Sequence, residues 1–343
     1  MLVSFLVPVY NVEKYLEECI ESLLIQKGAP FEIVLLDDGS TDSSGAICDS
    51  YARKYPDTVR VIHKDNEGLL MTRRRGFKEA NGDWFICVDS DDYVDMNLLD
   101  QVALTIEKHD CDMVMYNYQY ADDAGNKTPS RLKMKDGTIY TEDNKKELYL
   151  NRLFSTNINN MWLRAIRKDI VDIAVDYSNC GIRNMCEDAV QVLPLYTNTK
   201  KTVYIDKNLY YYRKNDASIT GKVSWETWRA MNKSFTITEK YLDVWNISLE
   251  DRKCFYTKQM EVMCNCVRWM FSDVNKKDAG LESWIEQLKE DARFDMCRKY
   301  FDKKYCSTKY MKICVPLFIE HIENLNIKKL KLYFELERKL RRI

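Results

Sequence analysis

Short apolar segments alternate with helical patterns through residues 1–115, and each segment ends in polar side chains. In the first helical stretch Leu16, Cys19, Ile20, Leu23 and Leu24 fall on one face. The expected order is strand 2–9, helix 16–24, strand 31–36, helix 44–55, strand 59–63, helix 69–80 and strand 84–88. Continuously apolar strands separated by helices predict an α/β fold with a mostly parallel sheet and helices on both faces.

Polar residues follow the strands at the places where an α/β sheet binds ligands. Tyr10 follows the first strand, Asp38 the second, 64–66 the third and 89–92 the fourth. Ligands of such sheets bind outside the carboxyl ends of the strands. The sequence therefore predicts one binding site built from these four segments.

The segment 89–92, Asp-Ser-Asp-Asp, places three carboxylates directly after the apolar run 84–88. Carboxylates in this position fit Mg²⁺ or Mn²⁺, which sit between one or two protein carboxylates and substrate phosphates. The same four residues also make a good turn and helix cap. The cluster alone leaves both interpretations open.

Several other functions are disfavoured by the sequence. No Gly-x-Gly-x-x-Gly or Gly-x-x-x-x-Gly-Lys follows any strand, which argues against dinucleotide and phosphate-loop sites. The net charge of −1 gives no bulk attraction to nucleic acid. Three histidines without ligand spacing argue against zinc, and twelve scattered cysteines without a secretory leader predict reduced thiols in the cytoplasm.

The rest of the chain predicts an acceptor-side half and a helical domain. The first half contains a strand at 111–120, a turn at 122–126, a helix at 142–154, a helical pattern opening at 186–188 and two short strands at 202–205 and 209–212. Beyond Trp225 the periodicity is helical throughout. We expect domains at 1–220, divided into 1–110 and 111–220, and at 221–343.

Five motifs of the N-terminal half resemble one enzyme family in their order and spacing. They are Leu-Val-Pro-Val-Tyr-Asn at 6–11, the segment 32–42 with Asp-Asp-Gly-Ser, Asn-Glu-Gly-Leu at 66–69, the arginines of 73–76 and the segment 82–92. This set resembles the nucleotide-sugar domain of family 2 glycosyltransferases, which have the GT-A fold. The resemblance is strong over 1–110 and looser to about 220, where 187–188 and 210–219 resemble acceptor-side motifs.

The resemblance implies a base pocket and a diphosphate contact. Pro8 and Tyr10 would line the pocket, with the tyrosine ring stacked on the base. Asp38 would accept a hydrogen bond from a uracil imide, and Asn66 and Arg73 would complete the contacts to base and diphosphate. A UDP-sugar is therefore the expected donor, although the motif alone does not prove uridine.

The residues Asp89, Ser90 and Asp91 resemble the Asp-x-Asp motif of the family. Asp89 and Ser90 would lie at the donor, with Asp89 at the ribose or the metal. Asp91 would coordinate the Mn²⁺ or Mg²⁺ that bridges the diphosphate and assists its departure.

The resemblance also implies an inverting, single-displacement transfer with one base on the acceptor side. Asp188 is the expected base and Glu187 the residue that positions the acceptor, and a helix start would favour an ionised carboxylate there. Arg213 and Ser218 resemble a loop that closes over the diphosphate.

The segment 327–343 is a basic amphipathic pattern. It fits a helix lying in an anionic membrane interface, a helix packed on its own bundle, or the seam of a homodimer. A membrane helix would suit an acceptor that is a lipid-linked sugar.

These expectations define a metal-dependent glycosyltransferase that transfers a sugar from a nucleotide-sugar to a hydroxyl of a glycan or lipid-linked acceptor in cell-surface polysaccharide biosynthesis. It would act in the cytoplasm or on the cytoplasmic membrane face. Two alternatives remain open: a nucleotidyltransferase, which usually needs glycines after the first strand where 8–11 reads Pro-Val-Tyr-Asn, and a degenerate transferase that serves as a carbohydrate-binding or scaffold module.

Overall fold

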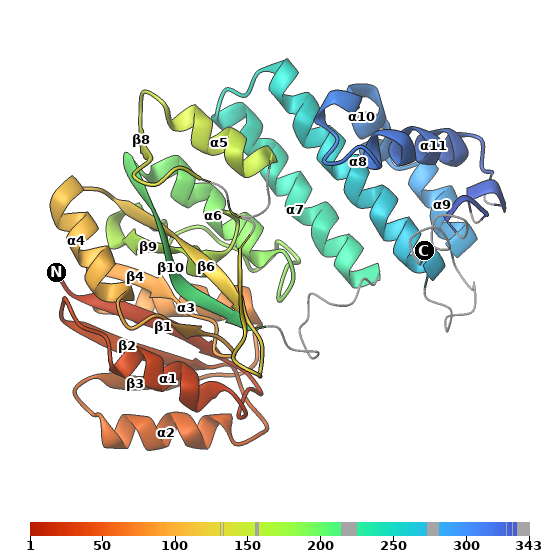
Figure 1. The fold of residues 1–343 in the computed structure, drawn as a ribbon. Coiled ribbons are helices and arrows are strands. Elements are labelled where there is room, and N and C mark those ends of the chain that lie inside the picture. The colour runs from red at the N-terminus through yellow and green to blue at the C-terminus, as the bar shows by residue number, and fades with distance from the viewer. Residues whose placement is uncertain are drawn as a thin grey trace. The chain divides into compact units, whose positions relative to one another are not determined.

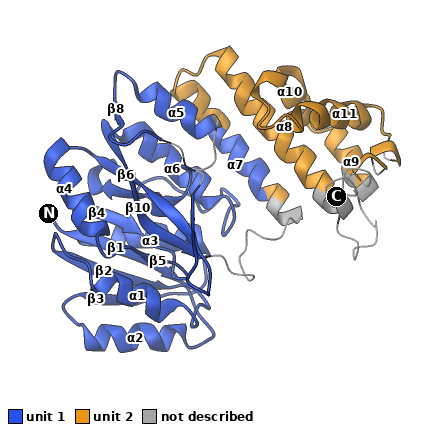
Figure 2. Ribbon diagram, viewed as in Figure 1, with its two compact units in different colours: residues 1–221, 230–238 blue, residues 222–229, 239–343 orange. Residues whose placement is uncertain are grey.

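The structure is a computed structural model, and it describes residues 1–130, 132, 134–154, 158–213, 225–272, 281–326, 328–330 and 332–334. The chain forms two compact units (Figure 2). The first contains Met1–Gly221 and Ala230–Thr238, and the second Lys222–Arg229 and Glu239–Ile343. Helix α7 (Trp225–Val244) contributes to both units.

The first unit is built on one sheet with the path β3-β2-β1-β4-β9-β6-β10-β5 (Figure 1). Its N-terminal strands are parallel to their neighbours, so their carboxyl ends meet at one edge. The elements of this part are β1 (Val3–Val9), α1 (Leu16–Leu24), β2 (Phe31–Asp37), α2 (Ser44–Lys54), β3 (Val59–His63), α3 (Leu69–Glu79) and β4 (Trp84–Cys87). These bounds agree with the sequence prediction to within two residues.

The second half of the sheet is mixed, so antiparallel strands join the parallel N-terminal strands in one sheet. Strand β9 runs antiparallel to both β4 and β6, and β5, β7 and β8 pair antiparallel as well. Only β6 and β10 are parallel to each other there. The elements are β5 (Tyr93–Val94), α4 (Leu98–His109), β6 (Met113–Ala121), β7 (Lys127–Pro129), β8 (Ile139–Thr141), α5 (Lys145–Phe154), η2 (Met161–Leu163), β9 (Arg164–Arg167), η3 (Lys168–Ile170), α6 (Glu187–Asn198) and β10 (Lys201–Arg213).

Strand β10 differs from the expectation for this segment. Two short strands were expected at 202–205 and 209–212, because the polar residues 206–208 interrupt the apolar pattern. The structure has one strand whose pairing with β6 shifts register between Ile205 and Tyr210. Such bulges let an extra residue leave the ladder without ending the strand, so polar exposed positions need not break it.

Local sequence explains the two elements closest to the site. Helix α1 buries Leu16, Cys19, Ile20 and Leu23, the face that its 3.6-residue period predicts. In β1 the backbone of Leu6 faces β4, where its carbonyl accepts from the Val88 N–H at 2.9 Å. Pro8 has the same orientation but lies past the end of β4, so its missing N–H removes no ladder bond.

The second unit is helical, as expected. Helix α8 (Leu249–Ser272) packs against α10 (Ala292–Tyr300) and α11 (Met311–Glu323), and α9 (Leu281–Lys289) also contacts both. A short turn, η5 (Lys303–Tyr305), precedes α11. None of the helices in the described parts of the chain is long and apolar enough to cross a membrane.

Candidate active site

A buried arginine joins the carboxylates of two distant segments. Arg73 of α3 is fully buried, and its Nη2 donates to Asp89 Oδ1 at 2.7 Å. Its Nη1 donates to Asp188 Oδ1 at 2.5 Å and to Glu187 Oε1 at 3.3 Å. One guanidinium therefore links the carboxylate that follows β4 to both carboxylates at the start of α6. Three carboxylates around one guanidinium leave an excess of negative charge in a partly buried place.

Burial dominates the titration of the two carboxylates on α6. It raises the pKa of Glu187 to about 7, with the neighbouring Asp188 adding to the effect and Arg73 opposing it. Burial also raises the pKa of Asp188, again against the pull of Arg73. Burial therefore opposes the ionised forms that a helix start favours. Arg73 is the largest of the contributions that favour the charged forms of both carboxylates.

The structure places Arg73 among the acidic residues. Its side chain has no exposed surface, and both terminal nitrogens donate to carboxylates. Arg73 therefore orders the acidic residues from within, and its contact with base and diphosphate stays a prediction.

The turn after β4 is fixed by a further buried carboxylate. Asp92, only 1% exposed, accepts from the Tyr210 hydroxyl at 2.7 Å and from the Arg213 N–H at 2.7 Å. The Tyr210 hydroxyl in turn accepts from the Asp89 N–H at 3.1 Å. Burial and the nearby acids Asp91 and Asp89 raise the pKa of Asp92 well above its usual range. Asp92 thus acts as the anchor that ties the acidic turn to β10.

Arg213 lies against the same turn. Its Nε donates to the Asp91 carbonyl at 2.9 Å, and its terminal nitrogens form ion pairs with Glu18 at 2.5 Å and with Asp123 at 3.5 Å. The side chain is 7% exposed, so a contact with the diphosphate requires it to exchange these partners. Ser218, the other residue of the expected closing loop, lies outside the described residues.

Aromatic rings support the acidic turn from the strand side. Tyr210 stacks on Trp162 with ring centroids 4.3 Å apart, and Tyr212 also stacks on Trp162 at 5.7 Å. The Tyr116 hydroxyl donates to the Trp162 carbonyl at 2.7 Å. Rigid packed rings fix the Tyr210 hydroxyl, which holds Asp92 and the Asp89 backbone.

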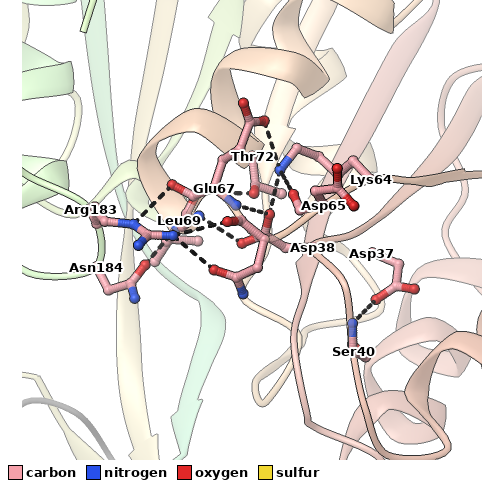
Figure 3. Close-up of polar contacts among 12 residues, drawn as sticks. Asp37, Asp38, Ser40, Lys64, Asp65, Glu67, Leu69, Thr72, Arg183 and Asn184 are labelled. Atoms are coloured by element: carbon pink, nitrogen blue, oxygen red, sulfur yellow. Dashed lines mark hydrogen bonds and ion pairs between the residues drawn. The ribbon is translucent and has the colours of Figure 1, made fainter. Parts of the chain in front are cut away.

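The second strand contributes Asp38, which is 3% exposed and organises the loop after β3 (Figure 3). Its two carboxylate oxygens accept from the Glu67 and Gly68 N–H groups, both at 2.9 Å, and it forms an ion pair with Lys64. Lys64 also donates to the Asp65 carbonyl at 2.7 Å. A carboxylate has about four acceptor positions, so these contacts leave room for a further donor such as a uracil imide.

The segment 183–184, just before α6, is hydrogen-bonded to the same loop (Figure 3). Arg183 Nη2 donates to both the carbonyl and the side-chain oxygen of Asn66 at 3.0 Å. Asn184 Oδ1 accepts from the Leu69 N–H at 2.8 Å at the start of α3. Gly68 between them has φ of +89°, and a Cβ there would lie 2.7 Å from Asn184 Oδ1. Only glycine fits this position without strain.

The first strand ends in residues with different tasks. Pro8 is buried within β1, whereas Tyr10 is 51% exposed beyond it and presents a ring to solvent. Asn11 has φ of +50°, and its side-chain oxygen accepts from the Thr41 N–H at 2.7 Å. Asn11 thereby fixes the loop that follows Asp38, and an exposed aromatic is left for stacking on a ligand.

The expected cation ligands meet only part of what a metal requires. No group of three His, Cys, Asp or Glu side chains within the described ranges is arranged to hold a metal ion by itself. Asp89 and Asp91 stand in one turn with the buried Ser90 between them, and Asp89 Oδ1 is taken by Arg73. Because Mg²⁺ and Mn²⁺ at diphosphates need only one or two protein carboxylates, this set fits a cation that arrives with its nucleotide.

Asp92 and Asn11 lie in segments that the sequence singles out, but the sequence assigned no individual role to either. Arg183 and Asn184 were not identified as site residues. Nothing in the local sequence of 181–184 indicates that Arg183 and Asn184 belong to the site, because both residue types are common on protein surfaces. Their contacts join positions more than a hundred residues apart.

The fold and the acidic edge define a class, the nucleotide-sugar-dependent glycosyltransferases of GT-A fold. A family model described as glycosyl transferase family 2 matches residues 4–172. The glycosyltransferase GlyG of Streptococcus pneumoniae serotype 4 is 32% identical over an alignment of 234 residues that covers 64% of this chain and 72% of GlyG. The chain therefore belongs to family 2 of the glycosyltransferases, as the motifs indicated, and a nucleotidyltransferase is not supported.

Similarity extends to a solved structure. The poly(ribitol-phosphate) beta-N-acetylglucosaminyltransferase TarS of Staphylococcus aureus is 29% identical over 62% of this chain and 35% of its own length. The crystal structure of S. aureus TarS 1-349 in complex with UDP-GlcNAc matches with a TM-score of 0.62 at 20% identity, over 99% of this chain and 92% of that chain. This likeness confirms the predicted fold class, with the helical region after the sheet.

Proposed function

We propose that the protein transfers a sugar from a UDP-sugar to a hydroxyl of a glycan or lipid-linked acceptor, with inversion and with the help of a divalent cation, in the synthesis of a cell-surface polysaccharide. One observation carries the proposal: Arg73 bonds a donor-side carboxylate, Asp89, and the two acceptor-side carboxylates, Glu187 and Asp188. An inverting transfer needs one base on the acceptor side, and the proposed cation needs a carboxylate on the donor side.

The acceptor hydroxyl would lose its proton to Asp188. As its oxygen forms a bond to the anomeric carbon, the bond from that carbon to the diphosphate breaks and the electron pair leaves with UDP. Burial makes Asp188 a stronger base than an exposed aspartate, while Arg73 keeps it charged before the reaction. Glu187, with a pKa of about 7, can hold a proton and donate a hydrogen bond to the acceptor.

Asp91, with Asp89, would hold the Mn²⁺ or Mg²⁺ at the diphosphate. The cation supplies positive charge that offsets the charge growing on the departing UDP. The fixed turn supports this role, because Asp92 and Tyr210 hold the backbone that carries both carboxylates.

UDP is the proposed nucleotide because of the residues that face the base. Tyr10 offers an exposed ring for stacking beside the buried Pro8, and Asp38 offers acceptor capacity to an imide N–H. TarS, with its UDP-GlcNAc complex, supports the same donor class. The sugar itself depends on pocket shape and is not assigned.

We further propose that the protein acts in the cytoplasm and contacts the membrane face through the basic segment 327–343, most of which lies outside the described residues. Basic amphipathic helices bind anionic interfaces. Co-sedimentation with anionic liposomes, with and without residues 327–343, tests this, and failure of the full chain to sediment overturns it. Light scattering would show whether the segment instead forms a homodimer seam.

The decisive experiment is calorimetric titration of UDP with Mn²⁺ and again with EDTA, with GDP and CDP as controls. Selective, metal-enhanced UDP binding supports the proposal. Turnover is then tested by slow hydrolysis of a panel of UDP-sugars. Binding without any hydrolysis or transfer would favour a carbohydrate-binding module, and the absence of nucleotide binding would refute the donor assignment.

A further inference from the structure

Arg183 fixes the orientation of the Asn66 side chain. Its Nη2 donates to Asn66 Oδ1 at 3.0 Å and to the Asn66 carbonyl at 3.0 Å, and its Nε donates to the Glu67 carbonyl at 3.3 Å (Figure 3). A guanidinium has donors only, so the amide oxygen of Asn66 must face it. The NH₂ group of Asn66 is thereby directed away from Arg183 as a donor.

This amide lies beside the carboxylate expected to read the base. The Asn66 backbone packs on Gly39, where an added Cβ would lie 3.2 Å from the Asn66 nitrogen. Gly39 follows Asp38 directly, and Asp38 accepts from the next two N–H groups after Asn66. Asn66 is exposed. The residue that carries the oriented donor therefore lies next to the segment that carries the Asp38 acceptor.

That pair matches one pyrimidine edge and mismatches the other. Uracil presents an N–H flanked by carbonyl oxygens, which suits a carboxylate next to an amide NH₂. Cytosine presents a ring-nitrogen acceptor and an amino donor, which would face the carboxylate and the NH₂ with like partners. We propose that Arg183 is a positioning residue that makes the pocket select uracil over cytosine, by holding the Asn66 amide in one of its two orientations. This inference rests on the proposed uridine donor.

The position of Arg183 is itself set by the fold. Its carbonyl accepts from the Leu70 N–H at 3.0 Å, and Asn184 Oδ1 accepts from the Leu69 N–H at 2.8 Å. A Cβ added at Gly68 would lie 2.7 Å from Asn184 Oδ1 and 3.0 Å from Arg183 Cβ, so the two segments pack closely. A surface arginine without such contacts would not hold an amide in one orientation. Arg183 can, because its own carbonyl and the side chain of the next residue are both hydrogen-bonded to the start of α3.

The test compares UDP and CDP affinities by calorimetry in the full chain, its Arg183→Met variant and a matched control. In the control, Arg74→Met, an arginine of α3 loses its bonds to the Asp172 and Val175 carbonyls at 2.7 and 3.3 Å without any contact to Asn66. We expect Arg183→Met to reduce the UDP-to-CDP preference about tenfold, the size of one hydrogen bond from a charged group. The preference should be unchanged in Arg74→Met.

A ratio within one protein is insensitive to a fraction of unfolded chains, so reduced stability does not mimic the effect. If Arg183 acts through Asn66, the variants Asn66→Ala and Asn66→Ala/Arg183→Met should share the same preference. The inference is overturned if Arg183→Met weakens the binding of UDP and of CDP equally. It is also overturned if the double variant has a lower UDP-to-CDP preference than Asn66→Ala. Absence of UDP binding by the unaltered chain would instead refute the proposed donor.

Discussion

Replacing Arg73 by methionine tests the central electrostatic claim. Methionine keeps an unbranched, flexible side chain and suits a helix. The change removes the guanidinium that forms ion pairs with Asp89, Glu187 and Asp188. Three carboxylates then share a partly buried place without their partner.

The magnitude follows from burial. The pKa of Glu187, about 7 against an ordinary 4.5, already corresponds to roughly 3 kcal/mol opposing its ionisation. Removing one partner of a buried ion pair costs about 3–5 kcal/mol. We expect Arg73→Met to lose about that much unfolding free energy at pH 8. Each further pKa unit that the carboxyls gain corresponds to ~1.4 kcal/mol.

The pH dependence has a definite sign. A carboxyl whose folded pKa lies above its unfolded value makes the native state bind more protons, so stability falls as pH rises between the two values. For Glu187 that window runs from 4.5 to about 7, and the variant extends it upward. The loss in Arg73→Met should therefore be largest at pH 8 and should shrink at pH 5, where the carboxyls take up protons.

Urea unfolding followed by circular dichroism at pH 5 and pH 8 measures this. Arg75→Met is the matched control, because Arg75 lies on the same helix, is 49% exposed and pairs with Glu79 at 2.9 Å. Exposed pairs contribute little, so this variant should remain within about 0.5 kcal/mol of the unaltered protein. A loss in Arg73→Met below about 1 kcal/mol, or one equal at both pH values, would refute the reasoning.

Three further variants test the proposed roles. Asp188→Asn should leave UDP affinity nearly unchanged and lower turnover about 100-fold or more, since general-base catalysis is lost; a near-normal rate in a transfer assay would require another base. Asp91→Ala should abolish the difference in UDP affinity between Mn²⁺ and EDTA titrations, and a persisting metal effect would remove Asp91 from the cation site. Tyr210→Phe deprives Asp92 Oδ2 and the Asp89 N–H of their partner, so urea unfolding should show a loss of about 1–3 kcal/mol; unchanged stability would mean that the hydroxyl does not hold the turn.

The strands could be predicted from the sequence because their apolar runs are local and continuous. Residues 59–63 form β3 as expected, and the polar residues after each strand reach one edge because parallel strands end together. The direction of β9 could not be predicted in this way. Its pairing with β4 and β6 depends on segments about 50 to 80 residues away, and nothing within Arg164–Arg167 specifies which neighbours it joins.

The site divides along the same line. Glu187 and Asp188 could be placed at a helix start from local sequence, but their charge state depends on Arg73, 114 and 115 residues earlier. Arg73 is one of three consecutive arginines on a helix, and the sequence does not distinguish it from its neighbours. Only the fold shows that Arg73 is buried while Arg75 is exposed. Helix α3 is bonded to the region before and at the start of α6 twice, by Arg183 at its N-terminus and by Arg73 one turn later. The start of α3 and the carboxylate expected to take the acceptor proton are therefore linked through Arg73, and neither segment taken alone indicates this link.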